Sequence, residues 1–267
     1  MIKDITIGQY FPGKSPVHRM DSRVKLVLTA VFIVMLFVAK NFWGLIVGIV
    51  FTLLTYALSR IPAKMMLKSL KPIVPIIVFT AILNLFFIRT GDVLFQFKFI
   101  RITYNGVSTA GFMIIRIICL IVGTSLLTYT TSPIDLTDAI ERLLSPLKKI
   151  KVPVHELAMM MTIALRFIPT LIEETDKIMS AQKARGADME TGSLIQRAKA
   201  LTPILIPLFV SSFRRAEELA LAMECRCYHG GEGRTRMKQL KTTAVDYAAL
   251  LYTAVFLAGV IAANHLL

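Results

Sequence analysis

Long apolar runs with almost no charge are the feature that most restricts what this chain can fold into. A bilayer span needs roughly 20 predominantly apolar residues. Five segments reach that length with their flanks: Leu26–Ala39, Phe42–Leu58, Ile73–Ile88, Val107–Tyr129 and Ala244–Ile261. Hydrophobic residues make up 55% of the 267-residue chain, more than is usual in soluble domains. The sequence therefore predicts an all-α, polytopic membrane protein with about five transmembrane helices.

Two further segments are not predicted to cross the membrane. The apolar segment Ile204–Val210 is interrupted by Pro207 and is followed by Arg214 and Arg215, so we expect a surface or bundle helix there. The first twenty residues have no apolar core, and no cleavable signal peptide is expected.

The distribution of Lys and Arg predicts the orientation, because cytoplasmic loops of membrane proteins carry an excess of positive charge. Segment 130–243, between the fourth and fifth spans, holds seventeen of these residues. The N-terminal segment and the second loop are also basic. The opposite side receives only four: Lys40, Arg89, Lys98 and Arg101. The pattern indicates five spans with a cytoplasmic N-terminus and a C-terminus outside.

The resulting division has three parts: transmembrane helices in 1–129, a cytoplasmic region in 130–243, and a last transmembrane helix in 244–267. The cytoplasmic region reads as three helices. The first begins at Ser132-Pro133, the second runs from Pro153 to about Ala184, and the third from about Ser193 to Arg226. The second and third are long for a soluble domain, where the mean is about 11–12 residues. On the third helix, Phe209, Phe213, Ala216, Ala220 and Met223 form an apolar stripe.

The loop before the fourth span contains an alternating segment, Phe95-Gln-Phe-Lys-Phe-Ile-Arg-Ile-Thr103. Alternation of this kind predicts paired strands. We expect a short hairpin on the outer surface, with turn residues at Gly91-Asp92 and Asn105-Gly106.

Each long cytoplasmic helix ends in an arginine between small residues. The second ends at Ala184-Arg185-Gly186 and the third at Cys225-Arg226-Cys227. One interpretation is electrostatic, since cations favour the negative end of the helix dipole. The other is docking, because small neighbours leave the guanidinium free to enter a partner's groove and bind a carboxylate in bidentate geometry. Spacing alone leaves both open.

These motifs, together with the N-terminal segment Tyr10-Phe-Pro-Gly-Lys-Ser-Pro-Val-His-Arg-Met-Asp-Ser-Arg-Val-Lys25, resemble the transmembrane T component of energy-coupling factor transporters, a branch of the ATP-binding-cassette importers. In that family two long coupling helices end in X-Arg-X motifs. Ala184-Arg185-Gly186 matches the first motif fully. Cys225-Arg226-Cys227 keeps the arginine of the second but replaces the usual Ala and Gly, which leaves its helix termination in question.

The resemblance implies a complex of four subunits. Two cytoplasmic ATPases hydrolyse ATP, and a membrane S component captures a vitamin or metal ion. The T component transmits the movements of the ATPases to the S component and has no catalytic residues or cofactor of its own. Arg185 and Arg226 would each enter a groove of one ATPase, and the triplets 184–186 and 225–227 would be the docking residues.

Other functions find little support in the sequence. Cys225, Cys227 and His229 form C-x-C-x-H, but a zinc site generally needs four ligands and no second cluster is present. No phosphate-binding G-x-x-x-x-G-K-[ST] loop occurs, which argues against ATP binding by that route. Membrane topology accounts for the net charge of +14 without nucleic-acid binding. The alternative that stays open is a self-sufficient channel or secondary transporter, in which Arg116 of the fourth span would line a pathway.

Overall fold

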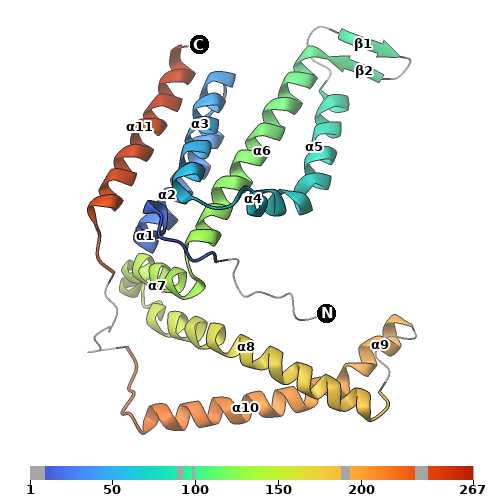
Figure 1. The fold of residues 1–267 in the computed structure, drawn as a ribbon, viewed down its shortest axis with the longest axis vertical. Coiled ribbons are helices and arrows are strands. Elements are labelled where there is room, and N and C mark those ends of the chain that lie inside the picture. Colours follow the sequence, from blue (N-terminus) through green and yellow to red (C-terminus); the bar gives the residue numbers. More distant parts are fainter. Residues whose placement is uncertain (1–9, 89–92, 98–99, 188–192, 232–239, 267) are drawn as a thin grey trace. The chain divides into compact units, whose positions relative to one another are not determined.

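The computed structural model describes residues 10–88, 93–97, 100–187, 193–231 and 240–266, and the chain forms two compact units (Figure 1). We call them the membrane unit, with described residues in 10–139 and 240–266, and the coupling unit, with described residues in 140–231. The helix α7 (Pro133–Leu144) contains the boundary between them. It begins where the sequence predicted, because the Ser132 hydroxyl accepts the N–H of Asp135 at 3.1 Å as an N-cap.

The membrane unit is built from helices, with one small hairpin. Its helices are α1 (Pro16–Arg19), α2 (Ser22–Val38), α3 (Phe42–Ser59), α4 (Ala63–Leu70), α5 (Val74–Phe87), α6 (Tyr104–Thr130) and α11 (Ala244–Leu266). A single 3₁₀ turn, Lys71–Ile73, joins α4 to α5. Helices α3 and α11 pack on each other, as do α5 and α6. The all-α fold expected from the apolar runs is confirmed.

In the part of the chain that the structure describes, five helices are long and apolar enough to cross a membrane, but they are not the five that the sequence predicted. The four predicted spans from Phe42 onward are among them, in α3, α4 with α5, α6 and α11. The fifth is α8 (Val154–Ala184), which we had placed in the cytoplasm. Helix α2, the first predicted span, is 17 residues long, which corresponds to roughly 26 Å of bilayer. Composition therefore does not distinguish α8 from a span.

Aromatic rings form the centre of the membrane unit. Phe51 of α3 stacks on Phe32 of α2, with ring centroids 5.4 Å apart, and on Tyr252 of α11 at 5.0 Å. Gly123 of α6 allows this packing, because a Cβ at that position would lie 2.1 Å from the Phe32 ring. Small residues of this kind let membrane helices approach closely. Helices α2 and α3 therefore meet α6 and α11, which come much later in the sequence, at one aromatic cluster.

Charged side chains are buried where α2 and α11 begin and α6 ends; we call Asp21, Arg23, Lys25 and Asp246 the Lys25–Asp246 cluster. The Lys25 ammonium donates to the backbone carbonyls of Thr130, at 2.8 Å, and His18, at 3.2 Å. The Asp246 carboxylate accepts the N–H of Asp21 at 2.8 Å and the N–H of Thr243 at 2.6 Å. Arg23 pairs with Asp21 at 2.6 Å. Each buried charge is thus matched by groups that helix ends leave free.

The N-terminal segment is attached to the same region. Phe11 donates its N–H to the Tyr129 carbonyl at 2.9 Å, and the Phe11 carbonyl lies 3.0 Å from Nε2 of His18. Burial, which disfavours the imidazolium, lowers the pKa of His18. A neutral ring that donates from Nε2 can accept the Ser15 hydroxyl at Nδ1, which lies 2.6 Å away. The segment is therefore held by specific hydrogen bonds.

The predicted hairpin is present as β1 (Val93–Phe97) and β2 (Ile100–Thr103), which pair antiparallel. Its predicted turn at Gly91-Asp92 lies outside the described residues. The second predicted turn, Asn105-Gly106, is wrong. These residues lie in the first turn of α6, because the Thr103 hydroxyl accepts the N–H of Gly106 at 3.2 Å and caps the helix.

The coupling unit contains a 3₁₀ segment (Ser145–Ile150), α8, α9 (Leu194–Ala200) and α10 (Thr202–Glu224). Helix α8 has 31 residues and continues through Pro169. The single helix predicted from Ser193 to Arg226 is instead two, divided at Leu201. The reason is Pro203, which has no N–H to continue the helical series of hydrogen bonds from α9. It occupies the first turn of α10, where proline is tolerated.

We predict that Asp246→Ala destabilises the membrane unit by about 3 kcal/mol, because the N–H groups of Asp21 and Thr243 lose a charged acceptor and the hydrogen bond from Asp21 is buried. Asp246 itself is only 1% exposed. The measurement is the fraction of detergent-solubilised protein that stays monodisperse after heating. The neighbouring Tyr247→Ala, at a residue 66% exposed, is the control and should leave the midpoint unchanged. Equal midpoints for both variants would contradict the role assigned to Asp246.

Candidate partner-binding site

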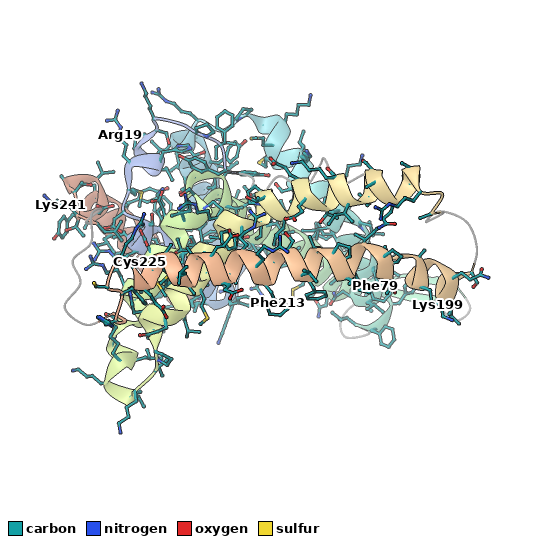
Figure 2. All side chains as sticks on the ribbon, turned by 90° about the horizontal axis from the view of Figure 1, so that it is seen from below. Arg19, Phe79, Lys199, Phe213, Cys225 and Lys241 are labelled. Carbon is teal, nitrogen blue, oxygen red and sulfur yellow. The ribbon has the colours of Figure 1, made fainter. Side chains whose placement is uncertain are left out.

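Helices α8 and α10 lie side by side and antiparallel (Figures 1 and 2). Near the end of α8, the Gln182 side chain reaches the carbonyl of Pro203 at the start of α10, at 3.4 Å. Further along, Glu174 of α8 pairs with Arg215 at 3.0 Å and accepts the hydroxyl of Ser211. The Arg215 guanidinium also lies 5.9 Å from the centre of the Phe167 ring. Residues near the end of α8 therefore contact residues near the start of α10, and residues earlier in α8 contact residues later in α10, as in an antiparallel pair.

The faces of α10 differ from those predicted. The side chains that α10 turns toward α8 are half-buried: Leu208, Ser211, Arg215 and Leu219. The predicted apolar stripe lies elsewhere, with Phe209 and Phe213 at 61% and 72% exposure and with Ala216 and Ala220 also exposed. Of the five stripe residues, only Met223 is half-buried. The stripe is therefore an open apolar surface of the coupling unit, not its contact with α8.

The first arginine motif closes α8 through its backbone. Gly186 has a φ of +84°, in the left-handed region that glycine tolerates. Its N–H donates to the Lys183 carbonyl at 3.0 Å, and the N–H of Ala187 donates to the Gln182 carbonyl at 3.0 Å. This pair of bonds is a Schellman motif. Arg185 is the last residue before the left-handed glycine.

The second motif has the same geometry despite its different residues. Cys227 has a φ of +56°, its N–H donates to the Glu224 carbonyl at 2.8 Å, and the N–H of Tyr228 donates to the Met223 carbonyl at 3.1 Å. Arg226 therefore occupies the position of Arg185. The question left by Cys227 is answered, because the helix ends in the same way without glycine. An L-residue in this conformation costs roughly 1–2 kcal/mol.

The two guanidinium groups are free to meet a partner. Backbone N–H groups already bond the carbonyls that each helix end leaves open, so neither arginine side chain is needed to close its helix. Both side chains are exposed, and within the described part of the chain neither makes an ion pair or hydrogen bond. The dipole interaction remains available to each. The backbone therefore closes each helix without help from its arginine side chain.

The antiparallel pairing separates the two motifs. Arg185 follows the end of α8, which adjoins the start of α10, whereas Arg226 follows the end of α10. With a rise of 1.5 Å per residue, the length of α10 places them roughly 35 Å apart. Figure 2 shows the labelled Cys225 at one end of α10 and Lys199 of α9 at the other. The arginines therefore present two separate positive points, one at each end of the pair.

The segment after the second motif is packed on the first turn of α8. A Cβ on Gly231 would lie 2.5 Å from the His155 ring, so any other residue there would displace that ring. His155 in turn lies 3.1 Å from the Glu141 carboxylate. These contacts of His155 with Glu141 and Gly231, which hold the segment after the second motif against α8, were not predicted from the sequence. The glycine pair Gly230-Gly231 was the one sequence feature that pointed to a close contact there. Among the described residues, no group of three or more His, Cys, Asp or Glu side chains is arranged to hold a metal ion.

Arg116 has a local structural role. Its guanidinium donates to the carbonyl of Ala39, the residue that ends α2, and lies 4.6 Å from the centre of the Phe112 ring. A charged donor placed on a helix end and an aromatic face accounts for the charge within an apolar segment. The residue that would have lined a transport pathway instead joins α6 to α2.

Comparison with known proteins assigns the family. A family model described as CbiQ, cobalt transport protein, matches residues 13–237. A protein of Ruminiclostridium cellulolyticum named energy-coupling factor transporter transmembrane protein EcfT is 57% identical over 261 residues, covering 98% of this chain and 97% of the relative. The chain belongs to this family of energy-coupling factor transporter transmembrane proteins. Relatives with the same name from Clostridium kluyveri (58% identity, 94% of this chain, 93% of the relative) and Bacillus subtilis (48%, 94% and 95%) extend the similarity.

Membership confirms the resemblance seen in the two arginine motifs and the N-terminal segment. The protein is a multi-pass membrane component of an energy-coupling factor transporter, and it is not itself an enzyme. The stand-alone carrier considered from the sequence is therefore set aside.

We predict opposite effects of substitution at the two left-handed positions. Gly186→Val should loosen the end of α8, because a β-branched residue is strongly disfavoured at positive φ. Cys227→Gly should leave the end of α10 unchanged or stabilise it by about 1 kcal/mol, since it removes left-handed strain. Hydrogen exchange of the amides of residues 186 and 187, and of 227 and 228, measures both effects. Slower exchange in Gly186→Val would contradict the geometry described.

Proposed function

We propose that the chain couples two ABC-type ATPase subunits to a substrate-binding S component, for uptake of a vitamin or metal ion. Arg185 and Arg226 are the docking points, and each enters a groove of one ATPase and pairs with a carboxylate there. The observation that carries this proposal is the repeated geometry of the two motifs: an exposed, unpaired guanidinium beside a left-handed residue at the end of a long helix. The triplets 184–186 and 225–227 form the docking residues.

The arrangement of α8 and α10 supports a one-to-one assignment of motifs to ATPases. Two points roughly 35 Å apart cannot lie in one groove, whereas a pair of similar subunits offers one groove for each. The helices are bonded to each other through Glu174, Arg215 and Ser211, so a displacement at one end is transmitted along the pair. Coupling then requires no chemistry within this chain.

The exposed stripe of α10 supports a second partner. Phe209, Phe213, Ala216 and Ala220 form an apolar surface beside the docking arginines, and surfaces of this kind mark protein or membrane contacts. We assign it to the S component. Movement of the α8–α10 pair would then act directly on the substrate-binding subunit.

The orientation we propose has the N-terminus and segment 130–243 in the cytoplasm and the C-terminus outside. A cysteine introduced at Ser193 should react with a membrane-impermeant maleimide only after the membrane is opened. A cysteine at Asn264 near the other end of α11 should react in intact cells. The background is the variant in which Cys119, Cys225 and Cys227 are replaced by Ala, Ala and Gly. Labelling of position 193 in intact cells would overturn this orientation.

Charge reversal tests the docking arginines. Arg185→Glu or Arg226→Glu should weaken attachment of one ATPase, and the double variant should lose both. Removing one partner of a desolvated charge pair costs about 2–5 kcal/mol, against about 0.3–1 kcal/mol for a cation facing a helix dipole. Arg→Lys should restore binding only in part, because an ammonium lacks the planar fork. Retention of the ATPases on the tagged chain and uptake into vesicles are the measurements.

The matched control is Arg214→Glu. Arg214 is exposed on α10 and carries the same charge, but it lies away from the helix end. It should hold both ATPases. A second control, Cys225→Ala with Cys227→Gly, should keep both attachment and transport. Normal attachment in the double glutamate variant would show that docking does not use these arginines.

A further inference from the structure

The membrane unit contains a cavity of about 280 Å³ that is open to the surface. Its walls come from α1, α2, α3, α6 and α11. It extends from Pro16 and Val245, near the Lys25–Asp246 cluster, to Phe32 and Gly123, in the aromatic centre. Seven residues of α2 separate Lys25, the member of the cluster that lines the cavity, from Phe32, so the cavity is roughly 10 Å long between them. None of its lining residues belongs to the coupling unit.

The polar groups in the walls are already bonded. Five threonines line the cavity, and each donates its hydroxyl to the carbonyl four residues earlier in its own helix. Donation to the backbone leaves the methyl group as the free apolar part of each side chain: Thr29, Thr52, Thr55, Thr130 and Thr253. The remaining lining is largely aliphatic or aromatic, with Leu28, Leu126 and Leu127 among it. Such walls offer little to bind ordered water, which needs two to four polar partners.

The one charged lining residue is also occupied. Lys25 is 6% exposed, and its ammonium donates to the carbonyls of Thr130 and His18. The cavity therefore selects for an apolar guest and not for an anionic group. Its volume corresponds to roughly nine water molecules at about 30 Å³ each, and a methylene group occupies a similar volume. A chain of roughly eight to ten carbons fits.

We infer that this cavity binds the acyl chain of a membrane phospholipid. Three of the helices that form it, α3, α6 and α11, are long and apolar enough to cross a bilayer, so aliphatic chains are the molecules that surround the membrane unit at highest concentration. The chain inserts between α2, α3 and α11 and ends against the Phe32 and Phe51 rings. A lipid held there fills space that the side chains leave open, and it is a structural ligand of the membrane unit distinct from the docking motifs.

The experiment uses the purified protein in nanodiscs that contain a phosphatidylcholine with a diazirine near the middle of one acyl chain. After irradiation, mass spectrometry of peptides locates the crosslinks. We expect crosslinks on inward residues such as Thr29, Thr52 and Ala249, in addition to the lipid-facing surface. Ala249→Phe fills the cavity and should reduce the inward crosslinks at least fivefold. Ala254→Phe, on the exposed side of the same helix, is the matched control and should leave them unchanged.

A second filling variant, Ala248→Leu, keeps the test valid if Ala249→Phe does not fold; it should give a smaller reduction in the same direction. Crosslinks confined to outward residues, or inward crosslinks that neither filling variant reduces, would overturn the inference. Loss of the inward crosslinks when an S component is added would assign the cavity to that subunit and would also overturn it. None of these outcomes bears on ATPase docking, because no lining residue lies in the coupling unit.

Discussion

Buried charges at helix ends determine how the membrane unit is assembled. Lys25 bonds the last carbonyl of α6 from a position near the start of α2, and Asp246 at the start of α11 accepts the N–H of Asp21 just before α2. These residues are separated by more than a hundred positions in the sequence. A buried charge is tolerated only when it is paired or hydrogen-bonded, so each bond requires the other helix to end at the correct place. The aromatic cluster and the adjoining cavity depend on that alignment of α2, α6 and α11.

The coupling unit follows a different principle. Its two long helices bury little, and they are held together by the Glu174 bonds and a half-buried seam. Most of the α10 surface, including Phe209 and Phe213, stays exposed in the isolated chain. Helices that leave so much apolar surface uncovered are suited to a complex, where partners supply the missing contacts. The backbone closes both helix ends, which leaves Arg185 and Arg226 available for those contacts.

Sequence reasoning succeeded where one physical rule acts locally. Apolar runs located α3, α5, α6 and α11, Ser132 located the start of α7, and alternation located the β1–β2 hairpin. It failed where two rules compete. Asn105-Gly106 was assigned to a turn, but the Thr103 cap draws it into α6. The segment from about Ser193 to Arg226 was assigned to one helix, but Pro203 divides it into α9 and α10. Composition could not separate α8 from a membrane span, since α8 is long and apolar enough to cross a bilayer.

The sequence by itself determined that this protein lies in a membrane, and it marked the two arginine motifs. Those properties follow from residue types and their spacing, which need no knowledge of distant contacts. Only the tertiary structure decided that Cys227 ends its helix as Gly186 does, that α8 and α10 run antiparallel, and that the arginines stand at opposite ends of the pair. The tertiary structure also shows that the apolar stripe of α10 is exposed and that Arg116 donates to the carbonyl of Ala39. Such outcomes depend on which surfaces meet when separate helices pack. A periodic sequence pattern predicts that one face of a helix is apolar, but it does not predict which surface covers that face.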